Sequence, residues 1–280
     1  MVKPAAGQLR TRLLAAVSEL PADTPILLSG GIDSATVLAA SLELGRLPVC
    51  YTFHLEGSPS QDARVAASMT ETTGAELRTV VIPRDLDGLL ADVRFLIRSG
   101  VKPQKTFVQC AHPFHYLARQ ISADGYSLVS HGMAAGDLFP TSRKAMVIYS
   151  RGGQEAFDDY RRQQFDLYEN ARPMGISDLA VEHAAGLHGV RLADPYRHPE
   201  VVAYALGLRF DTIHRPRQKQ VLVDAFPEFW ARGAWYRKNS SLQVNSGIRE
   251  WHDVLLTTDA NRHGHKAIVG LYNSIAREAS

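Results

Sequence analysis

The stretch Ile26-Leu27-Leu28-Ser29-Gly30-Gly31-Ile32-Asp33-Ser34 decides the fold of this chain. Its three leading apolar residues predict a buried strand, and the two glycines predict a tight turn. From Asp33 to Leu44 the apolar residues recur at helical spacing, and Gly45 stands where a helix commonly ends. A strand, a glycine turn and a helix in this order form a general cradle for phosphate. The glycines admit the anion to the backbone, and the helix N-terminus offers free N–H groups.

On both sides of this stretch, helical and strand-like segments alternate. The expected helices cover residues 8–19, 33–44, 62–73, 85–98 and 112–122, and the expected strands cover 26–28, 49–53, 77–82 and 126–129. Such alternation implies right-handed crossovers, so we predict an α/β fold with a doubly wound, mostly parallel sheet. From about residue 150 strand signals become sparse, which predicts a mainly helical C-terminal half. We therefore divide the chain into an α/β core, 1–150, and a mainly helical part, 151–280.

Composition and charge exclude several classes of protein. The 280 residues are 45% hydrophobic and 21% charged, which is ordinary for a globular protein. The formal net charge of +2 offers no attraction for nucleic acid or an anionic membrane, so we expect neither as a partner. No stretch approaches the ~18 apolar residues of a membrane span, and we expect a cytoplasmic protein. Cys50 and Cys110 form no Cys-x-x-Cys pair, so we expect two buried thiols rather than a disulfide or a zinc site.

The polar residues of the glycine turn predict how it binds phosphate. Ser29 and Ser34 add hydroxyl donors, whereas the charge of Asp33 would repel phosphates unless a cation lay between them. We therefore assign Asp33 to Mg²⁺, which prefers oxygen ligands shared with phosphates. Neither Gly-Lys-Ser/Thr nor Gly-x-Gly-x-x-Gly occurs here, which argues against a P-loop kinase and a Rossmann dehydrogenase. The alternative interpretation is a serine-glycine turn that merely caps a helix.

Ser-Gly-Gly-x-Asp-Ser after an apolar strand resembles the signature of the ATP pyrophosphatase (PP-loop) superfamily, whose members cleave ATP to AMP and pyrophosphate. Within it, the chain is similar to the synthetase domain of asparagine synthetase, β-lactam synthetase and the lasso-peptide cyclases. The segments that carry this similarity are Tyr51-Thr52-Phe53, the second loop Ser130 to Phe139, Gly189 to Asp194, and Arg237-Lys238.

The resemblance implies an adenine nucleotide alpha hydrolase-like fold, with an ATP-binding core in 1–150 and a part in 151–280 that completes the synthetase site. It also implies ATP and Mg²⁺ as cofactors. The expected nucleotide-binding residues are Leu28, Ser29, Gly30, Gly31, Asp33, Ser34, Thr52, Phe53, Ser130 and Gly132. The expected metal ligands are Asp33 and Asp137, and the expected catalytic residues are His131, Asp137 and Lys238.

The second loop departs from the family pattern. Aligned backward from Leu138-Phe139, it has Asp137 in place of a Glu, Gly136 in place of a metal-binding Asp and Met133 in place of the catalytic Glu. A shift of one residue would let Asp137 serve as the second metal ligand. Gly189 likewise replaces the Glu that assists the base in the β-lactam-forming branch.

Two histidines and two basic segments are the remaining candidates. His131 and His188 lie beside the altered positions and are candidates for proton transfer, the alternative for each being a structural histidine. Lys238 is expected to stabilise charge on the departing pyrophosphate, unless it is a solvated surface lysine. The basic residues around Pro216, which are Arg215, Arg217 and Lys219, are candidates for binding an anionic substrate, but we favour a solvent-exposed face.

The function expected from the resemblance is that of an ATP-dependent carbon–nitrogen ligase. It would adenylate a small-molecule carboxylate for attack by an amine or ammonia. Val2 follows Met1 and the phosphate loop begins at Ser29, so we expect no N-terminal glutaminase domain. The nitrogen would then come from solution, from a separate protein or from the substrate itself. The alternatives are NAD synthetase-like amidation and a degenerate ATP-binding protein without catalysis.

Overall fold

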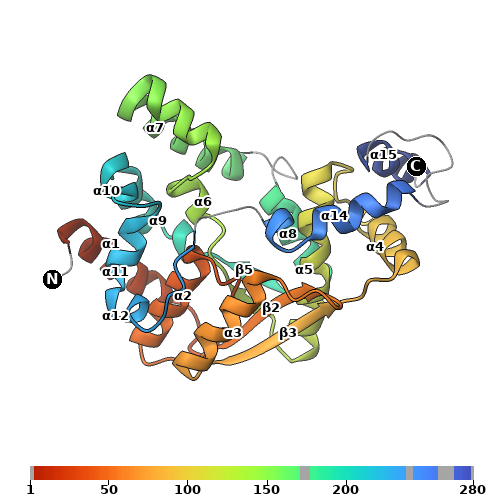
Figure 1. The fold of residues 1–280 in the computed structure, drawn as a ribbon, viewed down its shortest axis with the longest axis horizontal. Helices are drawn as coiled ribbons and strands as arrows, with labels where there is room; N and C mark the ends of the chain where they lie inside the picture. The colour runs from red at the N-terminus through yellow and green to blue at the C-terminus, as the bar shows by residue number, and fades with distance from the viewer. Residues whose placement is uncertain (1–2, 171–176, 238–241, 258–267, 279–280) are drawn as a thin grey trace.

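A five-stranded parallel sheet forms the centre of the molecule, with helices on both faces (Figure 1). The computed structural model describes residues 3–170, 177–237, 242–257 and 268–278. The strands are β1 Ile26–Leu27, β2 Val49–Leu55, β3 Glu76–Ile82, β4 Leu128–Ser130 and β5 Arg191–Ala193. Their order is β3-β2-β1-β4-β5, and every pairing is parallel. The predicted doubly wound α/β fold is confirmed.

The strand order reverses direction at β1. From there the chain passes to β2 and β3 on one side and later to β4 and β5 on the other. Ile26 is accordingly paired with Cys50 of β2 and with Ser130 of β4. Such a reversal opens a crevice at the carboxyl ends of the two diverging strands, where open α/β sheets bind their ligands. The loops after β1 and β4 flank this crevice.

Helices connect the strands and cover the sheet. In the first half they are α1 Pro4–Ser18, α2 Ile32–Glu43, α3 Gln61–Thr73, α4 Leu86–Arg98, α5 Lys105–Ala123, α6 Ala135–Leu138 and α7 Arg143–Asn170. The second half contains α8 Ser177–Gly186, η1 Pro195–Arg197, α9 Pro199–Leu206, α10 Phe210–His214, α11 Gln220–Ala225, α12 Pro227–Trp230, α13 Leu242–Asn245, α14 Ile248–Asp253, η2 Val254–Thr257 and α15 Ile268–Glu278. This half is mainly helical, as predicted, but its strand β5 was not expected.

Alternating strand residues feed two hydrophobic clusters. Ile26, Leu28 and Cys50 pack into the cluster built with α1, α2 and α9 to α12. Leu27 and Tyr51 face the other cluster, which includes α4, α5, α8, α14 and α15. Both clusters draw residues from each half of the chain, while the division at residue 150 stays a prediction. No helix in the described ranges is long and apolar enough to cross a membrane.

The two cysteines differ in exposure. Cys50 is fully buried in β2, as expected. Cys110 is only partly buried, because its position on α5 turns it toward the crevice rather than the core, so that expectation is half right. Burial raises the pKa of each thiol to about 12. Neither thiol is therefore an activated nucleophile at neutral pH.

A continuous series of polar side chains, here called the histidine chain, crosses the second cluster. Its members are Tyr272, His252, His112, Asp92, His115 and His188. The successive contacts measure 2.5 Å, 3.0 Å and 3.3 Å from Tyr272 to Asp92, then 4.0 Å to His115 and 2.9 Å on to His188. The histidine chain joins α15 and α14 to α5 and α4 in the layer on one side of the sheet (Figure 1).

Candidate functional site

A cavity of about 380 Å³ lies at the carboxyl ends of β1, β2 and β4. Its walls come from the loop after β1, from β2, from the loop after β4 and from α5, α8 and α13. This volume is within the range of small-molecule sites, roughly 300–1,000 Å³. The cavity therefore occupies the position that the strand order predicts for a ligand.

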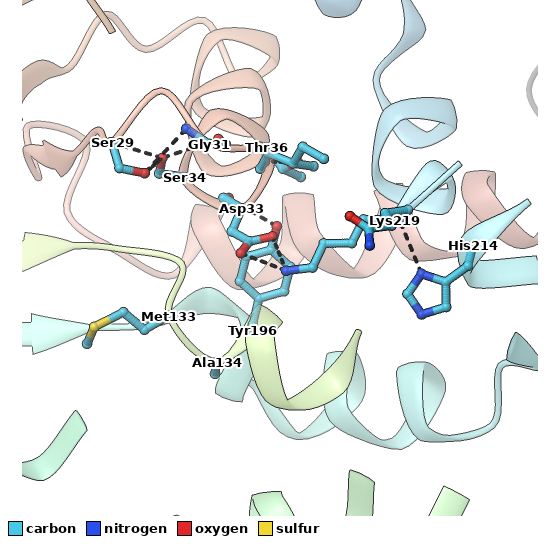
Figure 2. Close-up of polar contacts among 12 residues, drawn as sticks. Ser29, Gly31, Asp33, Ser34, Thr36, Met133, Ala134, Tyr196, His214 and Lys219 are labelled. Atoms are coloured by element: carbon cyan, nitrogen blue, oxygen red, sulfur yellow. Dashed lines mark hydrogen bonds and ion pairs between the residues drawn. The ribbon is translucent and has the colours of Figure 1, made fainter. Parts of the chain in front are cut away.

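The first loop is held in shape by its own serines (Figure 2). The Ser34 hydroxyl accepts a hydrogen bond from the backbone N–H of Ser29 at 3.1 Å and lies 3.1 Å from the Ser29 hydroxyl. The Ser29 hydroxyl in turn accepts from the N–H of Gly31 at 3.3 Å. Helix α2 begins at Ile32, directly after this turn, so its N-terminal N–H groups and positive dipole end face the cavity. The arrangement suits a phosphate group.

Two glycines are required by close approaches around this loop. Gly30 has φ of +68°, and a Cβ there would lie 2.7 Å from the carbonyl oxygen of Asp62. A Cβ on Gly132 would lie 2.8 Å from the carbonyl oxygen of Asp33. The first and second loops therefore touch through backbone alone, and no larger residue fits at either point.

The Asp33 carboxylate is neutralised by a lysine that the sequence did not single out. Lys219 donates from Nζ to both carboxylate oxygens of Asp33 at 2.7 Å, and its side chain is fully buried (Figure 2). The interpretation of Lys219 as part of an exposed basic face is therefore wrong, although Arg215 and Arg217 are exposed as expected. The cause is a backbone turn. Lys219 has φ of +54°, and its N–H donates a hydrogen bond to Nδ1 of His214. This turn at the start of α11 directs the lysine side chain inward.

Both carboxylates that the sequence predicts as magnesium ligands contact basic side chains in this structure. Asp33 is occupied by Lys219, and Asp137 contacts Arg197 at 3.4 Å. Mg²⁺ bound to either carboxylate would therefore have to displace this cation or share the carboxylate oxygens with it. Throughout the described ranges, no three His, Cys, Asp or Glu side chains group in a way that could hold a metal. Burial raises the pKa of Asp137 to about 7, which further weakens it as a ligand.

His131 and Asp194 form a buried pair behind the second loop. The Nδ1 atom of His131 accepts from the N–H of Met133 at 3.2 Å and lies 3.3 Å from Asp194. Asp194 accepts from the N–H groups of Ala134 and Tyr196 at 2.7 Å and 3.0 Å. Burial lowers the pKa of His131 to about 4 and raises that of Asp194 to about 7. The contact is therefore not an ion pair, and His131 is a weak base at neutral pH.

Most of the predicted nucleotide-binding residues line the cavity. Those that do so are Leu28, Ser29, Gly31, Asp33, Ser34, Thr52, Phe53 and Gly132, and the catalytic candidate His131 lines it as well. Gly30 supports the turn from behind, and Ser130 faces a separate, very small cavity that also contacts Thr24. His188 contacts His115 instead of the cavity, and Lys238 lies outside the described residues. The roles assigned to these residues stay predictions.

Sequence reasoning missed four side chains at the site. Besides Lys219, they are Tyr196, which donates to the carbonyl oxygen of Asp33 at 3.2 Å, and the pair Asp178 and Arg197. All four come from the helical second half, far from both loops in sequence. The basic segment around Pro216 was a signal for Lys219, but only the fold shows which of its three cations points inward.

The opposite rim of the cavity holds a second ion pair. Arg237 donates to Asp62 at 2.7 Å and to the carbonyl oxygen of Gly30 at 3.3 Å. Asn245 adds a contact to Asp62 at 3.4 Å. These bonds connect Arg237 and α13 to the first turn of α3 and to the first loop, so they close this rim of the cavity.

Comparison with known proteins agrees with this geometry. A family model described as asparagine synthase matches residues 8–173, which is more than half of the chain. The match contains both loops and four of the strands. Lys219, Asp178 and Arg237 lie beyond it. No curated protein matches the sequence.

Proposed function

The chain belongs to the asparagine synthase family, whose members are ATP-dependent synthetases, and on that premise we propose that it adenylates a carboxylate and transfers it to an amine or ammonia. A carboxylate oxygen attacks the α-phosphorus of ATP, the bond between the α and β phosphates breaks, and pyrophosphate leaves. The amine nitrogen then attacks the acyl carbon. The bond to the AMP oxygen breaks, and AMP and a proton are released.

The first loop is the observation that carries this proposal. Its serine hydroxyls, its glycine backbone and the N-terminus of α2 converge on one end of the cavity. Phosphate binding there needs no metal-binding side chain, because the loop itself supplies donors and a positive dipole end. The second loop closes the same cavity from β4, so a second substrate bound there would meet the phosphates.

Lys219 explains why an acidic residue is tolerated in a phosphate site. Its buried ammonium balances Asp33, so the first loop presents no net negative charge to ATP. Polyphosphate entering the loop would add a competing anion close to the same ammonium. We propose that Lys219 keeps the loop receptive to ATP and holds Asp33 in place. Magnesium stays a prediction from the resemblance, and we assign no step to it.

The nitrogen source is part of the proposal as well. Ammonia or an amine would enter from solution, from a separate supplying protein or from the substrate itself. The carboxylate substrate is a small molecule of a class that only turnover can identify.

An ATP-binding protein without turnover is the second candidate function. The observation in its favour is that Asp33 and Asp137, the two predicted metal ligands, are each paired with a basic side chain. Such a protein would bind ATP through the first loop and release no AMP.

Product analysis separates these functions. The protein is incubated with ATP and Mg²⁺ and with pools of carboxylic acids, with and without ammonium or primary amines. AMP and pyrophosphate that depend on the acid pool support adenylation. ADP as the product rules out cleavage between the α and β phosphates. ATP binding that Asp33→Ala weakens, with no turnover in any pool, supports the second candidate.

Two further variants test the second loop. His131→Ala and Asp137→Ala are each expected to slow AMP release more than about tenfold, a loss of about 1.4 kcal/mol in transition-state stabilisation. Asp23→Asn, an exposed carboxylate in the turn before β1, is the control. If both loop variants turn over like the control, the assignment of the second loop is wrong.

A further inference from the structure

The end of the cavity away from the first loop is lined by α5 and α8. Thr106, Cys110 and Phe114 recur every fourth residue on α5, so they share one face of the helix. Val181 and Asp178 face them from α8, and Met133 of the second loop completes the wall. This end is mainly apolar and carries one carboxylate.

Asp178 differs from the other two carboxylates that line the cavity. Asp33 is held by Lys219 at 2.7 Å, and Asp62 is held by Arg237 at 2.7 Å. Within the described ranges, the nearest cation to Asp178 is Arg197 at 3.6 Å, beyond a normal hydrogen bond. That guanidinium also contacts Asp137 at 3.4 Å and lies over the Tyr168 ring. Asp178 thus shares a single, distant cation with a second carboxylate.

The charge around this end is negative. Burial raises the pKa of Asp178; Asp194 and Glu182 add to this effect, and Arg197 and His131 oppose it. Among the described residues that line the cavity, Arg237 is the one basic side chain, and it is paired at the opposite rim. Among the described residues, an acidic substrate would therefore meet more carboxylates than cations at this end, whereas an ammonium group would find a carboxylate with spare hydrogen-bonding capacity.

We propose that the α5–α8 end of the cavity binds the amine substrate of the ligase reaction proposed above, with its ammonium group on Asp178 and an apolar body against Cys110, Phe114 and Val181. The substrate class is a primary amine on an aliphatic or aromatic body. The ammonium group would transfer one proton to the Asp178 carboxylate, and the free amine nitrogen would then attack the acyl carbon at the first-loop end. Asp178 determines specificity for this substrate.

Binding of simple probes tests the proposal without turnover. Benzylamine, benzyl alcohol and benzoate share one ring and differ in charge, and their affinities are measured by titration calorimetry on the full chain at pH 7.5. Benzylamine is expected to bind at least about tenfold more tightly than the other two. Asp178→Asn should remove this preference and leave the affinity for benzyl alcohol within about twofold, since the amide keeps the shape but loses the charge. Asp23→Asn is the matched control on an exposed carboxylate.

A second variant addresses the apolar wall. Cys110→Phe places a larger side chain on the cavity face of α5 and is expected to weaken benzylamine at least about tenfold while methylamine binding stays within about twofold. This arm keeps the proposal testable if Asp178→Asn fails to fold, which circular dichroism would show.

Three results would overturn the proposal: benzylamine affinity unchanged in Asp178→Asn, benzylamine affinity unchanged in Cys110→Phe, or competitive displacement of benzylamine by adenosine, which would assign this end to adenine. These outcomes are separate from failure of the ligase function. Charge-selective binding of benzylamine without AMP release would refute the ligase function and support the amine site. AMP release, with benzylamine affinity unchanged in Asp178→Asn, would support the ligase function and refute the amine site.

Discussion

Replacing Lys219 by methionine removes an ammonium group that both oxygens of Asp33 contact at 2.7 Å. At about 3 Å and an effective dielectric constant of about 20, the gross attraction is about 5.5 kcal/mol. Burial of the ammonium offsets part of this, and loss of one partner of a buried pair costs about 3–5 kcal/mol. Because 23% of the Asp33 side chain is exposed, water can reach its carboxylate. We therefore expect Lys219→Met to lower the free energy of unfolding by about 3 kcal/mol.

The substitution isolates the charge. Methionine keeps the apolar stem and the same left-handed backbone at residue 219, so neither packing nor backbone strain changes much. Urea unfolding followed by circular dichroism measures the effect, and Asp33→Asn with and without Lys219→Met completes a double-mutant cycle. The cycle should give a coupling energy of about 1–3 kcal/mol. Arg10→Met, which breaks a partly exposed pair with Glu43, is the control, with an expected cost of about 0–1 kcal/mol.

The same variant should weaken ATP binding about tenfold, because Asp33 would then repel the phosphates. The reasoning is refuted if Lys219→Met unfolds within about 0.5 kcal/mol of the wild type, or if the double variant is no more stable than Lys219→Met alone.

Three more outcomes follow from the fold. Gly132→Ala should weaken ATP binding more than about tenfold, because the new Cβ would lie 2.8 Å from the backbone of the first loop. Gly186→Ala is the control, since a Cβ there meets no atom within 4 Å, and it should bind ATP like the wild type in the same calorimetric titration. Arg161→Met should lower the free energy of unfolding by about 4 kcal/mol or more in thermal unfolding, since four carbonyl oxygens lose a buried donor. Equal effects in Arg161→Met and in Arg162→Met, which changes an exposed arginine, would contradict this. Burial lowers the pKa of His214 to about 4, below the value near 6.5 of an unfolded chain. The unfolded state therefore binds more protons between these values, and stability should fall as the pH drops from about 6.5 to 4. Urea midpoints at pH 5 and pH 7 should differ less in His214→Asn, and an unchanged difference would count against this origin.

The first half of the chain was predictable because its signals are local. A glycine turn, helical spacing and β-branched runs each act within a few residues, and they correctly placed β1 to β4 and the cavity between β1 and β4. Helix α5 begins at Lys105 rather than at 112 and continues through Pro113. The burial of Phe107, Val108 and Ala111 carries it across the proline, and that burial depends on distant elements.

The parts that failed depend on contacts between distant segments. β5 has three residues, too few to show a strand pattern in the sequence. Among the described strands it pairs with β4 alone, so its presence depends on that distant neighbour. Lys219 reads as one of three surface cations until the turn at the start of α11 is known. The contact between Asp137 and Arg197 could not be predicted for a similar reason, since Arg197 is sixty residues away in sequence and adjacent in space.

The histidine chain has a consequence for where its hydrogens lie. Hydrogen bonds from His112 and Tyr116 lower the pKa of Asp92 against the effect of burial, so this carboxylate is an acceptor only. His112 must then carry its hydrogen on Nε2, which leaves its Nδ1 to accept from His252. His252 in turn has a bare Nδ1, so the hydroxyl of Tyr272 has to donate.

The other arm is less strictly determined. His188 Nε2 and His115 Nδ1 lie 2.9 Å apart, so one of them donates to the other, while His115 Nε2 lies 4.0 Å from Asp92, beyond a hydrogen bond. The negative charge of Asp92 thus selects one tautomer for His112 and one for His252, and the hydrogens of the arm from Tyr272 point toward it. A proton added to Asp92 would reverse the direction of these hydrogen bonds as far as Tyr272 on α15. The NMR chemical shifts of the His252 ring nitrogens would then report on a carboxylate that His252 does not contact.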